Sequence, residues 1–129
     1  MKELEKKIYK HLKARKWNNL RPVDLAKSIM IEGAELLEIF QWENLSLEEI
    51  KNDKEKVEEI KKELADVMIY GLEMSVLLGL DTEKIIRKKL AHVVKKYPAK
   101  LIKKRKEASL TGSDYLRIKQ EYRNKALKK

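Results

Sequence analysis

One helix-length segment, residues 54–79, constrains the fold of this chain most strongly. It begins as the charged KEKVEEIKKE and becomes almost continuously apolar from residue 67 to residue 80. A surface helix needs only one apolar stripe, so an apolar half predicts burial on several sides. A chain of 129 residues can build a real core, but this segment also favours a partner surface that completes it.

The turn-forming residues are too few for a fold made of strands. The chain has four Gly and two Pro, with 43% hydrophobic and 40% charged residues. This composition argues against disorder and favours helices joined by short links. Hydrophobic periodicity predicts helices at about residues 2–16, 23–42, 54–79, 82–96 and 114–127. Ser46 and Glu49 match a capping box, and Asp53 can cap the helix that follows. We therefore expect an all-α bundle of four or five helices.

Several classes of protein are excluded by what the sequence lacks. Without Cys it has no disulfide, no thiolate zinc site and no Cys nucleophile. The N-terminal MKELEKKIYKHLK is charged and amphipathic rather than a secretory signal, and no apolar run approaches the roughly 18 residues of a membrane span. We expect a cytoplasmic protein that does not bind membranes.

The net charge of +10 is concentrated at the C-terminal end. Residues 99–129 carry 11 Lys and Arg against 3 acids, a net charge of +8, whereas residues 1–98 carry 20 against 18. No aromatic-rich or groove-reading motif accompanies the basic residues, so they do not indicate a specific nucleic-acid reader. The sequence predicts a nearly neutral domain at residues 1–98 and a basic, helical extension at residues 99–129.

Two pairs of carboxylates stand in apolar helical sequence: Glu32 with Glu35, and Glu63 with Asp66. A helix turns by about 100° per residue, so each pair lies on one face of its helix. Four acids that converge from two helices would form a site for a hard cation, because Mg²⁺ and Mn²⁺ prefer oxygen ligands. Such ions are commonly shared with substrate phosphates. The pattern therefore predicts metal-assisted hydrolysis of a phosphate ester or phosphoanhydride.

A structural interpretation of these acids competes with the metal site. They could instead form a buried salt-bridge network with Lys61, Lys62 or Lys96. Each pair places like charges together, which destabilises a helix by roughly a few tenths of a kcal/mol unless a cation compensates. Two such pairs on apolar faces favour the metal site.

The two acidic segments resemble a known family. The sequence SIMIEGAELLEIFQW (28–42), followed by ELADVMIYGLEM (63–74), is similar to the MazG-like all-α nucleoside triphosphate pyrophosphohydrolases, and within them to the small branch that includes dCTP pyrophosphatase. The resemblance covers about residues 12–98. It implies a helical bundle completed by oligomerisation, as a homodimer or homotetramer.

The resemblance also implies roles for individual residues. Mg²⁺, with Mn²⁺ as an alternative, is expected at Glu32, Glu35, Glu63 and Asp66, and we assign Glu35 as the base that accepts a proton from water. Aromatic positions that line a base and sugar pocket correspond to Trp17, Trp42 and Tyr70. An element that contacts the phosphates corresponds to Lys89, Lys96 and Tyr97.

The implied reaction is hydrolysis of a nucleoside or deoxynucleoside triphosphate to a monophosphate and pyrophosphate, with a dCTP-like preference and a house-cleaning role. Two alternatives remain open. One is a non-catalytic helical module whose basic extension binds nucleic acid or an acidic partner, with steep salt dependence. The other is an all-α dUTPase-like enzyme that also accepts diphosphates.

Overall fold

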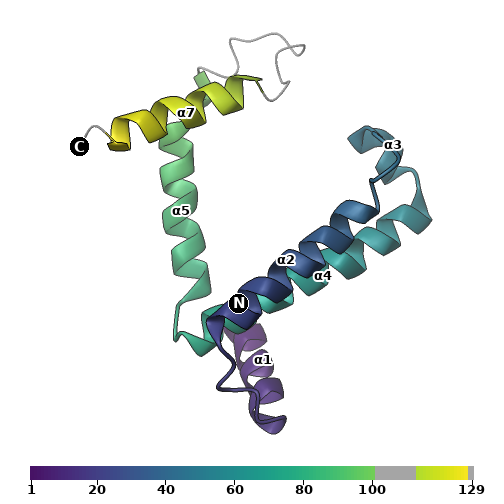
Figure 1. Ribbon diagram of the computed structural model, residues 1–129, viewed down its shortest axis with the longest axis vertical. Helices are drawn as coiled ribbons and strands as arrows, with labels where there is room; N and C mark the ends of the chain where they lie inside the picture. Colours follow the sequence, from purple (N-terminus) through teal and green to yellow (C-terminus); the bar gives the residue numbers. More distant parts are fainter. Residues whose placement is uncertain (101–112, 128–129) are drawn as a thin grey trace. The chain divides into compact units, whose positions relative to one another are not determined.

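The computed structural model describes residues 1–100 and 113–127, and all regular secondary structure in these ranges is helical (Figure 1). The all-α prediction is thereby confirmed. The helices are α1 (Lys2–Ala14), α2 (Pro22–Glu38), α3 (Leu47–Lys51), α4 (Lys54–Leu77), α5 (Thr82–Lys96) and α7 (Ser113–Leu127). None of these described helices is both long and apolar enough to cross a membrane. The chain divides into two compact units, Met1–Thr82 and Glu83–Lys129.

Helices α2 and α4 lie side by side and form the body of the first unit (Figure 1). They run in opposite directions. Lys56, near the start of α4, reaches the carbonyl of Ile39 just after the end of α2, whereas Asp24, near the start of α2, shares a cavity with Glu73 in the second half of α4. This arrangement sets the middle of α2 against the middle of α4.

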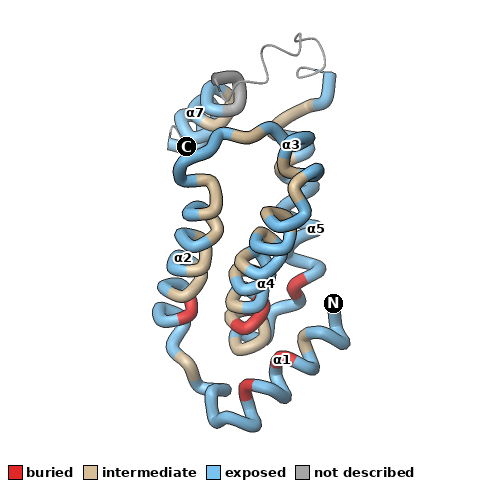
Figure 2. Tube along the Cα trace, turned by 90° about the vertical axis from the view of Figure 1, so that its right-hand side faces the viewer, coloured by how far each residue is buried: buried red, intermediate tan, exposed pale blue. Residues whose placement is uncertain are grey.

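The best-packed core of this unit lies where α1 meets α4. Ile8, Leu12 and Leu72 are buried together there, and Leu20, Val76 and Leu77 pack against them. Figure 2 shows these buried positions on α1 and on the second half of α4. Leu12 is completely buried, so truncation to Ala would remove about 2–5 kcal/mol of stability.

The apolar run at residues 67–80 is less buried than its sequence predicts. Leu72 is buried, but Met68, Ile69, Leu78 and Leu80 are each more than 40% exposed. The prediction of burial on several sides is wrong for these four side chains within the part of the chain that is described. The physical reason is that, among the described residues of its unit, this segment packs mainly against α1 and α2, which leave part of its circumference uncovered.

The ends of α1 and α4 are built in the same way. At the end of α1 the amide of Trp17 donates to the carbonyl of Leu12, and Lys16 adopts a left-handed φ of 58°. At the end of α4 the amide of Leu80 donates to the carbonyl of Ser75, with Gly79 at a φ of 66°. Both are Schellman motifs, in which the left-handed residue reverses the chain after the last helical turn.

Helix α2 ends at Glu38, four residues before the predicted end. The amides of Phe40, Gln41 and Glu43 each bond to the carbonyl three residues earlier, so the chain continues in turns rather than in α-helix.

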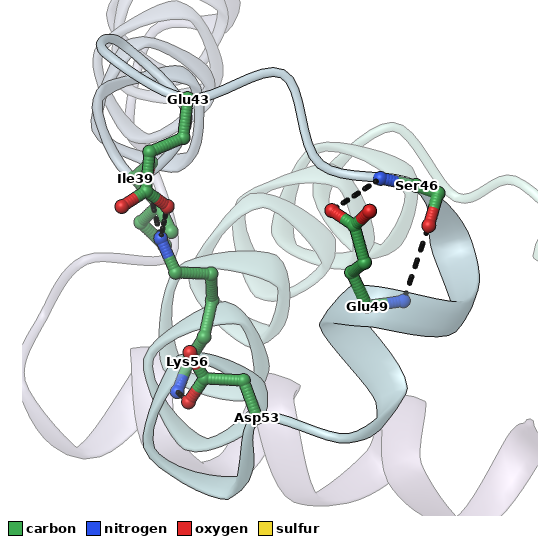
Figure 3. A network of polar contacts seen from close by, with 6 residues as sticks. All are labelled: Ile39, Glu43, Ser46, Glu49, Asp53 and Lys56. Atoms are coloured by element: carbon green, nitrogen blue, oxygen red, sulfur yellow. Dashed lines mark hydrogen bonds and ion pairs between the residues drawn. The ribbon is translucent and has the colours of Figure 1, made fainter.

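A polar network in the α2–α4 connection holds these helices together (Figure 3). Ser46 and Glu49 form the predicted capping box of α3, and the Asp53 side chain accepts from the amide of Lys56 at 3.1 Å, so both predicted caps are confirmed. The Lys56 ammonium bonds to the Glu43 carboxylate and to the carbonyl of Ile39. Its side chain is only 13% exposed, and Glu43 raises the pKa of Lys56. This lysine therefore links the two helix ends and helps fix their register.

In the second unit, the aromatic ring of Tyr122 on α7 contacts the last turns of α5. The Lys96 ammonium lies 5.0 Å from the ring centre of Tyr122 and 5.5 Å from that of Tyr97. His92 meets Tyr122 edge to face at 5.7 Å. The two helices of this unit are thus joined by cation–π and ring contacts.

Candidate functional site

The acidic residues predicted from the sequence meet between α2 and α4. Carboxylate oxygens of Glu32, Glu63 and Asp66 lie within 4.8 Å of one another. We call these three residues the acidic cluster. The i,i+3 spacing of Glu63 and Asp66 puts both on one face of α4, and the antiparallel packing brings Glu32 of α2 to that face. Glu35, one turn further along α2, is exposed and lies beside the cluster.

The electrostatics of the acidic cluster favour either protons or a cation. The pKa of Glu32 is raised from its usual 4.5, first by burial and then by the neighbouring Glu35 carboxyl, with Asp66 and Glu63 adding to the repulsion. The pKa of Glu63 is raised for the same reasons, burial first and Glu35 next. Crowded, partly buried carboxylates are therefore costly to ionise without a compensating positive charge.

One oxygen of the acidic cluster has no protein partner. The Oε2 atom of Glu63 is buried and makes no hydrogen bond with any residue in the described ranges. Of the lysines considered for a salt-bridge network (Lys61, Lys62 or Lys96), Lys61 instead pairs with Glu58 on the surface of α4. A buried carboxylate oxygen without a donor has the chemistry of a hard-cation ligand. The residues present therefore fit Mg²⁺ or Mn²⁺ better than they fit an internal ion-pair network.

A cavity of about 410 Å³ adjoins the acidic cluster. Asp66 belongs to both, and Trp17 and Tyr70 contribute aromatic rings to the cavity wall. Its size falls within the roughly 300–1,000 Å³ range of small-molecule sites. The cavity thus brings together two of the three aromatic residues predicted to contact a base.

The other predicted substrate residues are not part of this cavity. Trp42 follows α2 and is 88% exposed, and it does not line the cavity next to the acidic cluster. Lys89 and Lys96 lie on α5, with Tyr97 directly after it, in the second unit. Their roles at the phosphates stay predictions.

A family model matches this chain over residues 27–115, more than half of its length, and describes the MazG-like family. The matched region contains the whole acidic cluster. The chain belongs to the MazG-like family. No match was found among the curated proteins.

This MazG-like protein is also similar to a pyrophosphatase from Archaeoglobus fulgidus DSM 4304 whose crystal structure is known. The two chains share 37% sequence identity with a TM-score of 0.66, and the match covers 76% of this chain and 92% of the archaeal one. Family membership and the fold are therefore supported by independent comparisons of sequence and structure.

Four polar residues of the cavity were missed in the sequence of this MazG-like protein: His11, Asp24, Ser28 and Glu73. Glu73 is buried on α4, and His11 on α1 faces the same cavity. The signal was present for Glu73, since it is a lone carboxylate in the apolar run, seven residues after Asp66 and hence on the same helix face. For His11 there was none, because the sequence does not show which face of α1 turns toward α4.

Proposed function

We propose that this MazG-like protein hydrolyses nucleoside or deoxynucleoside triphosphates to a monophosphate and pyrophosphate, with Mg²⁺ bound by Glu32, Glu35, Glu63 and Asp66. The single observation that carries the proposal is the acidic cluster with its partnerless Glu63 oxygen, next to a cavity with two aromatic rings. The similarity to an archaeal pyrophosphatase supports the same class of reaction. Mn²⁺ is expected to replace Mg²⁺, because both prefer oxygen ligands.

The proposed reaction is an attack of water on the α phosphorus. The bond between this phosphorus and the oxygen that bridges to the β phosphorus breaks, and pyrophosphate leaves. Glu35 accepts the proton of the water, a role that suits its exposed carboxylate beside the cluster. Bound Mg²⁺ supplies charge neutralisation for the phosphate oxygens and favours deprotonation of water. Trp17 and Tyr70 hold the base, while Lys89, Lys96 and Tyr97 contact the phosphates.

We further propose that the functional form is a homodimer or homotetramer. On α2, Met30 is 73% exposed and Leu37 is 69% exposed, and both face away from the protein's own packing. Such apolar surface on a helix favours contact with a second copy of the chain. The proposal includes a cytoplasmic setting, where nucleoside triphosphates are available.

The test is incubation of the full-length protein with a panel of ribo- and deoxynucleoside triphosphates in Mg²⁺, with separate assays for pyrophosphate and orthophosphate. Pyrophosphate and a monophosphate in equal amounts are expected, with no turnover in EDTA and recovery in Mn²⁺. Orthophosphate as the product, or no product from any triphosphate, would refute the proposal. A parallel assay with dUDP distinguishes the proposed enzyme from a dUTPase-like enzyme, because only the latter would also cleave the diphosphate.

A further inference from the structure

We propose that Glu73 and His11 select the nucleobase, and that they favour bases with an exocyclic amino group (cytosine, adenine or guanine) over uracil and thymine. This inference rests on the proposed function and assigns specificity to the cavity beside the acidic cluster.

The starting observation is the placement of the Glu73 side chain. It is only 7% exposed, although it is a carboxylate in an otherwise apolar stretch of α4. It lines the cavity that also contains Trp17, Tyr70 and Asp66, and none of the described residues donates a hydrogen bond to it. Its oxygens are not among the described buried atoms that lack a partner, so they reach the open space of the cavity, where an N–H group of a ligand can bond to them.

The surroundings of Glu73 differ from those of the acidic cluster. The pKa of Glu73 is raised, mainly by burial, and the nearby His11 is a smaller opposing influence. His11 in turn meets the Trp17 ring edge to face at 6.1 Å. The His11 imidazole partly offsets the effect of burial on Glu73, and the aromatic ring beside both residues offers a surface on which a base can stack.

The distance along α4 suits a nucleotide. Asp66 and Glu73 are seven residues apart, which is about 10 Å along a helix at 1.5 Å per residue. Both line the cavity, with Asp66 also part of the acidic cluster. A nucleotide with its phosphates at the cluster therefore extends its base toward Glu73.

The chemistry of a carboxylate determines which bases it accepts. An ionised carboxylate has acceptors only, so it needs an N–H donor from the ligand. Cytosine and adenine present an amino group where uracil and hypoxanthine present a carbonyl oxygen, which a carboxylate repels. Uracil and hypoxanthine also carry a ring N–H, but the carbonyl oxygen beside it faces the second carboxylate oxygen, so the amino-bearing bases are favoured. Acidic side chains accept from the cytosine amino group in the same way in nucleic-acid recognition. A hydrogen bond to a charged group corresponds to roughly a tenfold preference or more.

The experiment compares substrate pairs that differ at this group: dCTP with dUTP, dATP with dITP, and dGTP with dITP. In the wild-type protein we expect kcat/KM to favour the amino member of at least one pair by about tenfold or more. In Glu73→Gln the new amide can donate to a carbonyl, so the ratio falls to within about threefold of unity. Glu59→Gln, an exposed carboxylate on the same helix, is the matched control and keeps the wild-type ratio.

Folding and turnover are tested separately. Circular dichroism establishes that each variant is folded, and Glu73→Met offers an apolar side chain of similar length if the amide is not tolerated. His11→Gln, at an exposed position of α1, is expected to reduce the ratio by about threefold because the carboxylate loses the imidazole that offsets the effect of burial. Calorimetric titration with dCMP and dUMP measures the same preference without hydrolysis.

The outcomes distinguish this inference from the proposed function. Pyrophosphate release with equal rates for both members of every pair, or ratios unchanged in the folded Glu73 and His11 variants, would overturn the inference and leave the proposed function intact. An absence of pyrophosphate from every triphosphate would overturn the proposed function and this inference with it. An amino preference lost only in the Glu73 and His11 variants would support both.

Discussion

Helix α4 differs between the half that ends at Asp66 and the half that follows. In the first half, Glu63 and Asp66 meet Glu32 of α2, and a buried carboxylate oxygen is left without a donor. In the second half, Leu72 packs with Ile8 and Leu12 of α1 in the buried core. One region opposes folding through repulsion and desolvation, and the other drives folding through apolar burial. We therefore expect stability and the proposed activity to be separable along a single helix.

The largest expected effect is the loss of activity in Glu63→Gln. The amide removes a negative charge and a proposed metal ligand, so kcat/KM should fall by about a thousandfold or more, equivalent to ~4 kcal/mol of transition-state stabilisation. The melting temperature of the metal-free protein should not fall, because a repelling charge has been removed. Asp66→Asn is expected to behave in the same way. Retained turnover in both variants would remove the basis for the metal site.

Next in size is the loss of stability in Leu12→Ala. Truncation of this fully buried side chain should lower the free energy of unfolding by about 2–5 kcal/mol in urea titrations. Below the unfolding transition, kcat should change little, since Leu12 does not touch the acidic cluster. Leu47→Ala, at a position that is 69% exposed, is the control and should change stability by less than about 0.5 kcal/mol. A large loss of kcat in folded Leu12→Ala would show that the two regions are coupled.

Metal binding should change how the acidic cluster responds to pH. Because folding raises the pKa of Glu32 and Glu63 above 4.5, the folded state binds these protons more tightly than the unfolded state. Their contribution to stability is present below pH 4.5 and is lost as the pH rises through the raised values. In EDTA, the free energy of unfolding of the wild-type protein should therefore fall as the pH rises over this interval. The free energy of unfolding of Glu63→Gln should fall less steeply, because one of the two groups with a raised pKa is absent.

Mg²⁺ should reverse this loss above the raised pKa values. At a free metal concentration of about 100 times Kd, binding to the folded state alone adds about 2.7 kcal/mol. Thermal melts at neutral pH with and without Mg²⁺ measure the effect. An equal shift in wild-type protein and in Glu63→Gln would place the ion elsewhere.

The smallest effect is expected at the capping box of α3, which belongs to neither half of α4. Ser46→Ala removes the acceptor of the Glu49 amide and should cost about 0.5–2 kcal/mol. Ser28→Ala is the control, because the Ser28 hydroxyl donates to the Asp24 carbonyl of its own helix and caps nothing. Equal effects in urea titrations would argue against a capping role.

Much of the site could be predicted from local sequence. The spacing of Glu63 and Asp66 fixed their common face, and the capping pair Ser46 and Glu49 needed only its three-residue separation. The sequence also places Glu73 on the helix face of Asp66, but whether that side chain is buried in a cavity could not be predicted in this way. Whether a carboxylate in an apolar run faces solvent or a cavity depends on α1 and α2, which are distant in sequence. The same holds for Lys56, which has no sequence signal for its contact with Glu43.

The sequence by itself determined that this chain is helical, where most helices begin and end, and that two pairs of acids lie on helix faces. These properties follow from hydrogen bonds and side-chain spacing within a few residues of each position. Only the tertiary structure decided that Glu32 meets Glu63 and Asp66, that one oxygen of Glu63 lacks a partner, and that Glu73 and His11 share a cavity. Those properties depend on the antiparallel register of α2 and α4 and on the position of α1. That register is set by packing and charge contacts between residues far apart in the chain.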